Sequence, residues 1–139
     1  MDKVYLLGGL RSYVGVVNGM YRHVPAEKLG AAVLRQVLKK YEIEKPDYII
    51  AGNGVGAGGN IARLMALEAE VDISVPAFTI DVQCGSGLES IAVAAAKIAS
   101  GEADCIVAGG FESSSTQPRR GYNPNHPDYR GDSWYSVAK

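Results

Sequence analysis

Residues 75–110 read VPAFTIDVQCGSGLESIAVAAAKIASGEADCIVAGG and contain an apolar run, an alanine-rich segment and a second apolar run. Residues 75–82 and 104–110 have the length and composition of buried strands. Residues 85–100, between them, predict a helix whose small side chains suit packing among close neighbours, and Gly101 is placed to end it. A strand, a helix and a second strand in this order indicate a βαβ unit with parallel strands.

The rest of the chain repeats this theme of an apolar strand, glycines and a helix. Apolar runs at residues 4–9 and 47–52 predict two further strands, and residues 60–70 predict a further helix. Residues 11–24 contain glycines and polar residues and predict a loop. The expected fold class is therefore α/β, with four strands in a mostly parallel sheet and helices on both of its faces.

A first helix is expected over residues 25–41. Pro25 suits the first helical turn, because the N–H group that it lacks has no partner there. The apolar stripe of this helix recurs every four residues and consists of Leu29, Val33, Val37 and Tyr41.

The composition is that of an ordinary globular domain. Of the 139 residues, 47% are hydrophobic and 21% are charged, and the net charge is −1, which argues against a disordered chain. The acidic and basic residues are nearly balanced, so no excess of basic residues points to nucleic-acid binding. The longest helix-like apolar stretch, residues 91–96, is far shorter than the roughly 20 residues that cross a bilayer. Two cysteines are too few for a disulfide framework or a cysteine-only zinc site. We therefore expect a cytoplasmic protein without a nucleic-acid, membrane or metal partner.

Cys84 stands in the segment Cys84-Gly85-Ser86-Gly87, at the predicted junction between a strand and a helix. The first N–H groups of a helix are unpaired and lie at its positive end, which favours a thiolate and can hold an oxyanion. Gly85 and Gly87 lack a Cβ, so a substrate carbonyl can approach the sulfur closely. Acyl transfer through a covalent thioester needs this combination, and we predict that Cys84 is a nucleophile supported by Gly85, Ser86 and Gly87. The alternative is a structural cysteine at a tight turn.

Several blocks of the sequence resemble the thiolase family, the acetyl-CoA acetyltransferases. The blocks occur in the family's order over nearly the whole chain, and they are Arg11 with Gly15, residues 59–63, residues 75–79, residues 84–88 and residues 108–113. The resemblance is to the N-terminal half of a thiolase only.

The resemblance implies a role for Cys84 and a division of the catalytic groups. The matching cysteine of thiolases attacks an acyl-CoA thioester and becomes acylated, and its backbone N–H contributes to an oxyanion hole. The family's catalytic His, its water-orienting Asn and its second Cys lie in the C-terminal half. The chain is thus expected to be one half of an acyl-CoA C-acyltransferase. Its partners would be the acyl-CoA substrate and a complementary C-terminal-half polypeptide, with no cofactor beyond the coenzyme A thioester.

The resemblance also implies a domain organisation. The family's strand order of 3-2-1-4-5 would leave this chain with four of five strands. Residues 1–118 would form an incomplete N-terminal domain, and residues 119–139 the start of the lid region. The strand at residues 77–82 would pair with its own copy across a two-fold axis and form a homodimer.

Other residues that could carry acid–base chemistry have simpler interpretations. Cys105 lies in an apolar strand and is expected to be a core thiol. His23 and His126 stand in loops and are expected to be solvated or locally bonded; His126 is the better candidate of the two, because the family's lid folds over the acyl site. Arg119 and Arg120 are expected to form a solvated charge patch.

Two alternative functions remain open from the sequence. The chain could be an inactive half-thiolase that serves as an assembly or binding module, with Cys84 a relic. It could also bind a dinucleotide, because residues 54–59 match Gly-x-Gly-x-x-Gly and Asp81 follows about twenty residues later. The glycine segment follows the second predicted strand rather than the first, which makes this alternative the weaker one.

Overall fold

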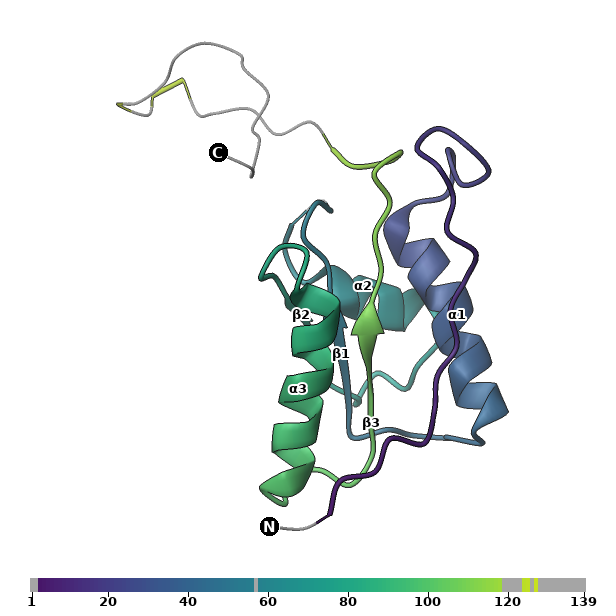
Figure 1. The fold of residues 1–139 in the computed structure, drawn as a ribbon, viewed down its shortest axis with the longest axis vertical. Coiled ribbons are helices and arrows are strands. Elements are labelled where there is room, and N and C mark those ends of the chain that lie inside the picture. Colours follow the sequence, from purple (N-terminus) through teal and green to yellow (C-terminus); the bar gives the residue numbers. More distant parts are fainter. Residues whose placement is uncertain (1–2, 57, 119–123, 126, 128–139) are drawn as a thin grey trace.

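The computed structural model describes residues 3–56, 58–118, 124–125 and 127, and Figure 1 shows its ribbon. Over these residues the chain forms three helices alternating with three strands. In chain order they are α1 (Ala26–Lys40), β1 (Tyr48–Gly52), α2 (Ile61–Glu68), β2 (Ala77–Ile80), α3 (Ser86–Ala99) and β3 (Ile106–Gly110).

The three strands form one parallel sheet in the order β2-β1-β3. Helices α1 and α2 lie on one side of it and α3 on the other (Figure 1). The predicted α/β class, with a parallel sheet covered on both faces, is confirmed. Because the strands are parallel, their carboxyl ends meet at one edge, and the loops after Gly52, Ile80 and Gly110 lie together there.

The main core lies between the sheet and the α1–α2 pair. Ile49 and Ala51 of β1 belong to this cluster together with Leu34 of α1 and Met65 of α2. Ile50 is fully buried as well. Because successive side chains of a strand point to opposite faces, Ile50 lies under α3.

Local signals in the sequence place the helix ends correctly. Asn60 caps α2, since its side chain accepts a hydrogen bond from the Arg63 N–H. Gly101 follows α3 with a φ of 78° and a backbone N–H that donates to Ile98, the ending that glycine allows.

The buried face of α1 differs from the predicted stripe. Leu29, Val33 and Val37 are only half-buried, whereas the buried positions are Ala26, Gly30, Ala31 and Leu34. The reason is close packing against α2, because a Cβ added at Gly30 would lie 2.6 Å from the Met65 sulfur. Three small residues together with Leu34, rather than the predicted stripe, therefore form the buried face of α1.

The strand predicted at residues 4–9 is absent, and so is the expected strand order. This segment contains no strand, and Leu6 and Leu7 are 83% and 76% exposed. Strands β1 and β3 pair directly from Tyr48 with Ile106 to Gly52 with Gly110. No unpaired edge is left between them for a further strand, so an apolar run without a partner stays outside the sheet. The described sheet has three strands rather than four.

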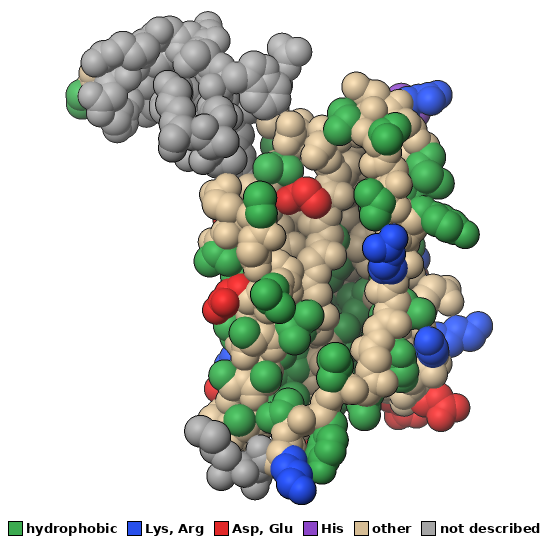
Figure 2. Space-filling model, in the orientation of Figure 1, with side chains coloured by type: hydrophobic (Ala, Val, Ile, Leu, Met, Phe, Trp, Pro, Cys, Tyr) green, Lys and Arg blue, Asp and Glu red, His purple; other side chains and the backbone are tan. Residues whose placement is uncertain are grey.

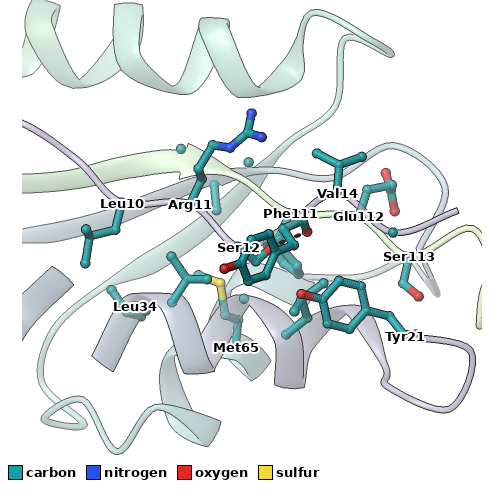
Figure 3. Close-up of a pocket in the computed structure, with 18 of the residues that line it drawn as sticks. Leu10, Arg11, Ser12, Val14, Tyr21, Leu34, Met65, Phe111, Glu112 and Ser113 are labelled. Atoms are coloured by element: carbon teal, nitrogen blue, oxygen red, sulfur yellow. Dashed lines mark hydrogen bonds between the residues drawn. The ribbon is translucent and has the colours of Figure 1, made fainter. Parts of the chain in front are cut away.

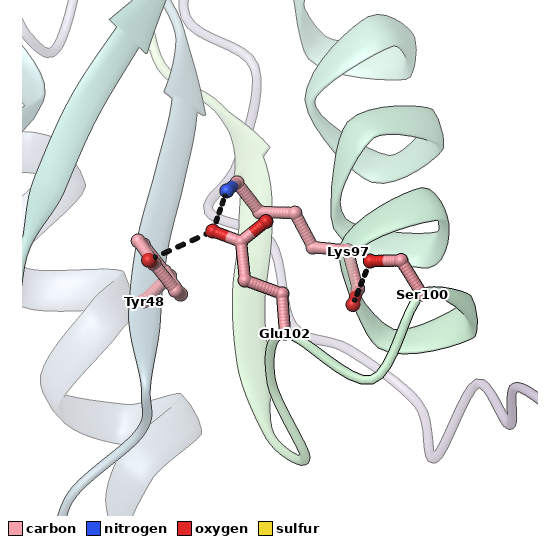
Figure 4. A network of polar contacts seen from close by, with 4 residues as sticks. All are labelled: Tyr48, Lys97, Ser100 and Glu102. Atoms are coloured by element: carbon pink, nitrogen blue, oxygen red, sulfur yellow. Dashed lines mark hydrogen bonds and ion pairs between the residues drawn. The ribbon is translucent and has the colours of Figure 1, made fainter.

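Polar contacts join the amino end of β1 to the carboxyl end of α3. Tyr48 donates a hydrogen bond to Glu102 (3.0 Å), and Lys97 forms an ion pair with the same carboxylate (Figure 4). The Lys97 ammonium also lies 4.5 Å from the centre of the Tyr48 ring. These contacts hold the carboxyl end of α3 against β1. They lie at the amino ends of the strands, opposite the loops that follow Gly52 and Ile80.

Candidate active site

Cys84 lies on the turn between β2 and α3, at the carboxyl edge of the sheet, and it is exposed. Helix α3 begins at Ser86, so the sulfur precedes the first helical residue by two positions. In open α/β sheets this edge is where ligands bind. The position predicted for Cys84, at a strand-to-helix junction, is confirmed, while its catalytic role stays a prediction.

The turn that carries Cys84 is held by its own polar groups. Ser86 is buried, and its hydroxyl accepts from the Val82 N–H (2.9 Å) and donates to the Gln83 carbonyl (2.6 Å). The Asp81 carboxylate accepts from the Gln83 N–H (3.0 Å). Gln83 has a φ of 61°, which is uncommon for a residue with a side chain. Ser86 thus holds the turn through two hydrogen bonds that the sequence alone did not indicate, while its part in supporting the nucleophile stays a prediction.

Three glycines allow the start of α3 to lie directly against the sheet. A Cβ added at Gly52 would lie 2.4 Å from the Ser86 carbonyl carbon and 2.5 Å from the Gly87 nitrogen. A Cβ added at Gly110 would lie 3.1 Å from Gly87 Cα. Ser90, fully buried, places its hydroxyl 2.7 Å from the carbonyls of both Gly87 and Gly109. The close approach brings the Cys84 turn against the carboxyl ends of β1 and β3.

Asn53 connects the carboxyl ends of all three strands, and sequence reasoning missed it. Its backbone N–H donates to Ile80 at the end of β2 (3.1 Å), and its side-chain amide donates to Phe111 just after β3 (2.8 Å). The amide also donates to Glu112 (3.0 Å) and accepts from the Gly56 N–H (3.0 Å). The only signal in the sequence was an asparagine placed directly after a strand, at the start of the glycine-rich loop.

The glycine-rich loop already holds an anion that belongs to the protein. The Glu112 carboxylate accepts from the N–H groups of Gly54 (2.9 Å) and Val55 (3.0 Å), where a dinucleotide-binding loop would present N–H groups to a phosphate. Asp81 bonds to Gln83 in its own turn. These contacts argue against the dinucleotide alternative for residues 54–59.

The other candidate residues lie away from Cys84 or outside the described part of the chain. Cys105 is half-buried just before β3, and burial, followed by the nearby Asp47 carboxylate, raises the pKa of its thiol. His23 is exposed and accepts a hydrogen bond from the Arg22 guanidinium (3.0 Å), the local bonding that was expected. His126, Arg119 and Arg120 fall outside the described residues.

A cavity of about 370 Å³ lies on the α1 side of the sheet (Figure 3). Its walls include the half-buried stripe of α1, residues 10–17 and Phe111, and Glu112 lies at its edge. Cys84 is not among its lining residues, so the cavity belongs to the N-terminal segment rather than to the cysteine.

Metal-binding clusters and membrane-spanning helices are both absent from the part of the chain that the structure describes. No group of three or more His, Cys, Asp or Glu side chains in it could hold a metal ion. No helix in that part is long and apolar enough to cross a membrane.

Comparison with known proteins places these features in a family. A family model described as the thiolase N-terminal domain matches residues 4–136. A Bacillus subtilis (strain 168) protein assigned as an acetyl-CoA C-acetyltransferase is 41% identical over 128 residues, which cover 92% of this chain and 35% of that protein. A Staphylococcus epidermidis protein assigned as an acetyl-CoA acyltransferase is 38% identical over 122 residues, which cover 85% of this chain and 31% of that protein.

A solved structure agrees with the sequence relatives. The crystal structure of the Bacillus anthracis acetyl-CoA acetyltransferase superposes with a TM-score of 0.77 at 28% identity, over 86% of this chain and 32% of that one. The chain thus spans about a third of the length of these relatives. Because the match to the family's N-terminal domain extends from residue 4 to residue 136, the chain belongs to the thiolase family.

Proposed function

We propose that this chain is the acyl-accepting half of an acyl-CoA C-acyltransferase and that Cys84 is its nucleophile. The observation that carries the proposal is an exposed thiol on the turn before α3, in a chain of the thiolase family. The names assigned to the relatives support an acyl-CoA as the substrate.

The first step in this proposal exchanges an acyl group between two sulfur atoms. The Cys84 thiolate attacks the carbonyl carbon of the acyl-CoA thioester, and a new S–C bond forms. The bond to the coenzyme A sulfur breaks, and coenzyme A leaves as a thiol after taking up the proton that Cys84 lost. The backbone N–H of Cys84 would help to hold the oxyanion that forms in between, since the N–H groups of Gly85 and Ser86 already donate to the carbonyls of Val82 and Gln83.

The second step depends on the direction of the reaction. In synthesis, a base removes a proton from the α-carbon of a second acyl-CoA, and that carbon attacks the acyl-Cys84 thioester. A C–C bond forms and the Cys84 thiol is released; thiolysis is the reverse. A complementary C-terminal half would supply the acid–base groups, because neither His23, bonded to Arg22, nor the half-buried Cys105 lies on the Cys84 turn.

Thiol labelling tests the nucleophile. Limited iodoacetamide at neutral pH, followed by peptide mass mapping, should label Cys84 well before Cys105. Since exposure alone favours Cys84, a matched control is needed, and Ser100→Cys supplies a thiol at an exposed position at the opposite end of α3. Cys84 should react faster than the thiol at position 100, because the positive end of the helix favours the thiolate and the negative end disfavours it. Equal rates at the two ends would contradict the proposal.

Acylation separates an enzyme from an assembly module. With the complementary half present, acetyl-CoA should leave an adduct of about 42 Da on Cys84, and Cys84→Ser should abolish it. If the two halves bind each other but no adduct forms, the assembly-module alternative holds and Cys84 is not the nucleophile.

A further inference from the structure

We propose that Glu112 is a positioning residue, which holds the turn carrying Cys84 in place through the Asn53–Gly56 loop. The inference rests on the proposed function of Cys84. Glu112 itself lies just beyond β3 and is not one of the predicted site residues. Its carboxylate bonds to the N–H groups of Gly54 and Val55 and to the side-chain amide of Asn53, at 2.9 to 3.0 Å.

The loop that Glu112 holds lies against the Cys84 turn. Asn53, which Glu112 holds, donates its backbone N–H to the Ile80 carbonyl (3.1 Å) at the end of β2. A Cβ added at Gly54 would lie 3.5 Å from the Asp81 carboxylate and 3.8 Å from Gln83 Cα, so the space between the two segments is about that of a methyl group. The Asp81 carboxylate accepts from the Gln83 N–H, and Gln83 has the uncommon positive φ immediately before Cys84. The contacts therefore run from Glu112 through Asn53 to Ile80, and from there along the chain to the Asp81–Gln83 turn that precedes the nucleophile.

The bonds of Glu112 can be removed with almost no change in shape. Glu112→Gln keeps the length of the side chain but turns one of its two oxygens into an NH₂ donor. In one orientation of the amide, the NH₂ group faces the N–H groups of Gly54 and Val55. In the other orientation, it faces the side-chain amide of Asn53. In either case an NH₂ donor stands where an oxygen accepted a hydrogen bond. Released from Glu112, the loop should stop supporting the Asp81–Gln83 turn, and Cys84 should lose its orientation at the positive end of α3.

Hydrogen exchange and thiol labelling on this chain test the proposal together. Glu112→Gln should speed amide exchange both in peptides covering residues 53–56 and in those covering residues 82–85. It should lower the iodoacetamide rate of Cys84 at pH 7 by about two- to five-fold, the range that a helix dipole contributes. The matched control is Glu102→Gln, which removes a hydrogen-bonded carboxylate near the amino ends of the strands. It should leave both the amide exchange of residues 82–85 and the labelling rate of Cys84 unchanged.

The outcomes separate this inference from the proposed function. Faster exchange confined to residues 53–56, with an unchanged Cys84 rate, would overturn the positioning role, as would an equal effect of Glu102→Gln. A wild-type Cys84 that reacts no faster than the thiol at position 100 would reject the nucleophile instead, and the exchange at residues 82–85 would still decide whether Glu112 holds the turn. If Glu112→Gln does not fold, Glu112→Asp keeps the charge on a shorter side chain and should change both readouts in the same direction.

Discussion

Asp47 shows how one exposed carboxylate joins two strands at their amino ends. Its side chain accepts from the backbone N–H groups of Asp104 (2.8 Å) and Cys105 (2.9 Å), just before β3 begins. These two backbone hydrogen bonds, the Cys105 bond first, lower the pKa of Asp47 from its ordinary value of 3.8. The ionised form is therefore the one that the folded chain stabilises.

The sign of this shift gives a pH prediction. A carboxyl whose pKa is lower in the folded state adds stability above the unfolded value of 3.8, and this stability is lost as the pH falls through the folded value. In the wild type, protonation of Asp47 contributes to the decrease in the free energy of unfolding below pH 3.8. Asp47→Asn should therefore make this decrease smaller, as measured by urea denaturation at a series of pH values. The effect should be below about 1 kcal/mol, since the group is exposed to solvent.

The control for Asp47 is one of its own partners. Asp104 contributes its backbone N–H rather than its side chain to this contact, so Asp104→Asn should leave the pH dependence as in the wild type. A change of equal size in the two variants would show that general surface charge, and not the bonded carboxylate, sets the slope.

At the scale of elements, the seat of α3 on the sheet makes Gly52 a sensitive position. A Cβ there meets the backbone of Ser86 and Gly87, which cannot rotate away as a side chain can. Gly52→Ala should lower the free energy of unfolding by about 1–3 kcal/mol, the usual cost of overpacking, and should also slow iodoacetamide labelling of Cys84. Urea denaturation and the labelling rate measure the two effects.

The neighbouring strand offers a matched control. Gly109 in β3 has open space where a Cβ would lie, so Gly109→Ala should cost far less than Gly52→Ala. Equal destabilisation by the two alanines would mean that strand flexibility, rather than the close approach of α3, explains the glycine at position 52.

At the scale of the whole molecule, the exposed surface suggests association. Figure 2 shows hydrophobic side chains on the surface over α3 and over the N-terminal segment, and Leu88 of α3 is 74% exposed. Strand β2 forms one edge of the described sheet and β3 the other. Exposed hydrophobic side chains that gather on one surface and unpaired strand edges favour contact with other chains.

We expect a homodimer through β2. Ile49 and Asn53 donate to the carbonyls of Pro76 and Ile80, so the even-numbered residues of β2 face β1. The N–H groups of Ala77 and Thr79 then point away from β1, to the outer edge of the sheet, where the Asn60 amide bonds the Ala77 carbonyl. Ala77→Pro should remove an outward donor and convert the dimer to monomers in light scattering, while Ala77→Ser should leave it intact.

Position 77 is a better place for this test than position 79. The hydrogen bond that Ala77 makes to the start of α2 is through its carbonyl, which accepts from the Asn60 amide (2.8 Å) and which a proline keeps. The Thr79 hydroxyl accepts from the Ala62 N–H and donates to Asn60, so a change at Thr79 would also disturb the start of α2. A wild-type chain that scatters as a monomer of 14.7 kDa while keeping a folded near-ultraviolet circular dichroism spectrum would contradict the dimer.

We also expect that the chain alone does not turn over. General acid–base groups contribute about a hundred- to ten-thousand-fold to such reactions, and in the proposal they lie on the complementary half. The purified chain should therefore neither form nor cleave acetoacetyl-CoA at an enzymatic rate, as followed by the absorbance of the thioester. Full activity that is lost in Cys84→Ser, from a chain of confirmed intact mass, would mean that residues of this chain supply the acid–base groups.

Features encoded by neighbouring residues were predictable from the sequence. The parallel α/β class follows from the alternation of apolar runs and helical segments, and the ends of the helices follow from short signals such as Pro25 and Gly101. Each of these signals acts within about one helical turn, so it can be recognised without knowing what lies beside it. The motif around Cys84 indicated a candidate nucleophile for the same reason.

Only the tertiary structure decided which segments find partners. The apolar run at residues 4–9 has the composition of a strand, but β1 and β3 pair directly with each other and leave no place for it between them. The site contacts of Asn53 and Glu112 join residues 58 and 59 positions apart, a distance over which no local pattern carries information. Strand pairing and buried polar bonds depend on what the folded chain brings together, whereas helix ends and turns depend on the residues next to them.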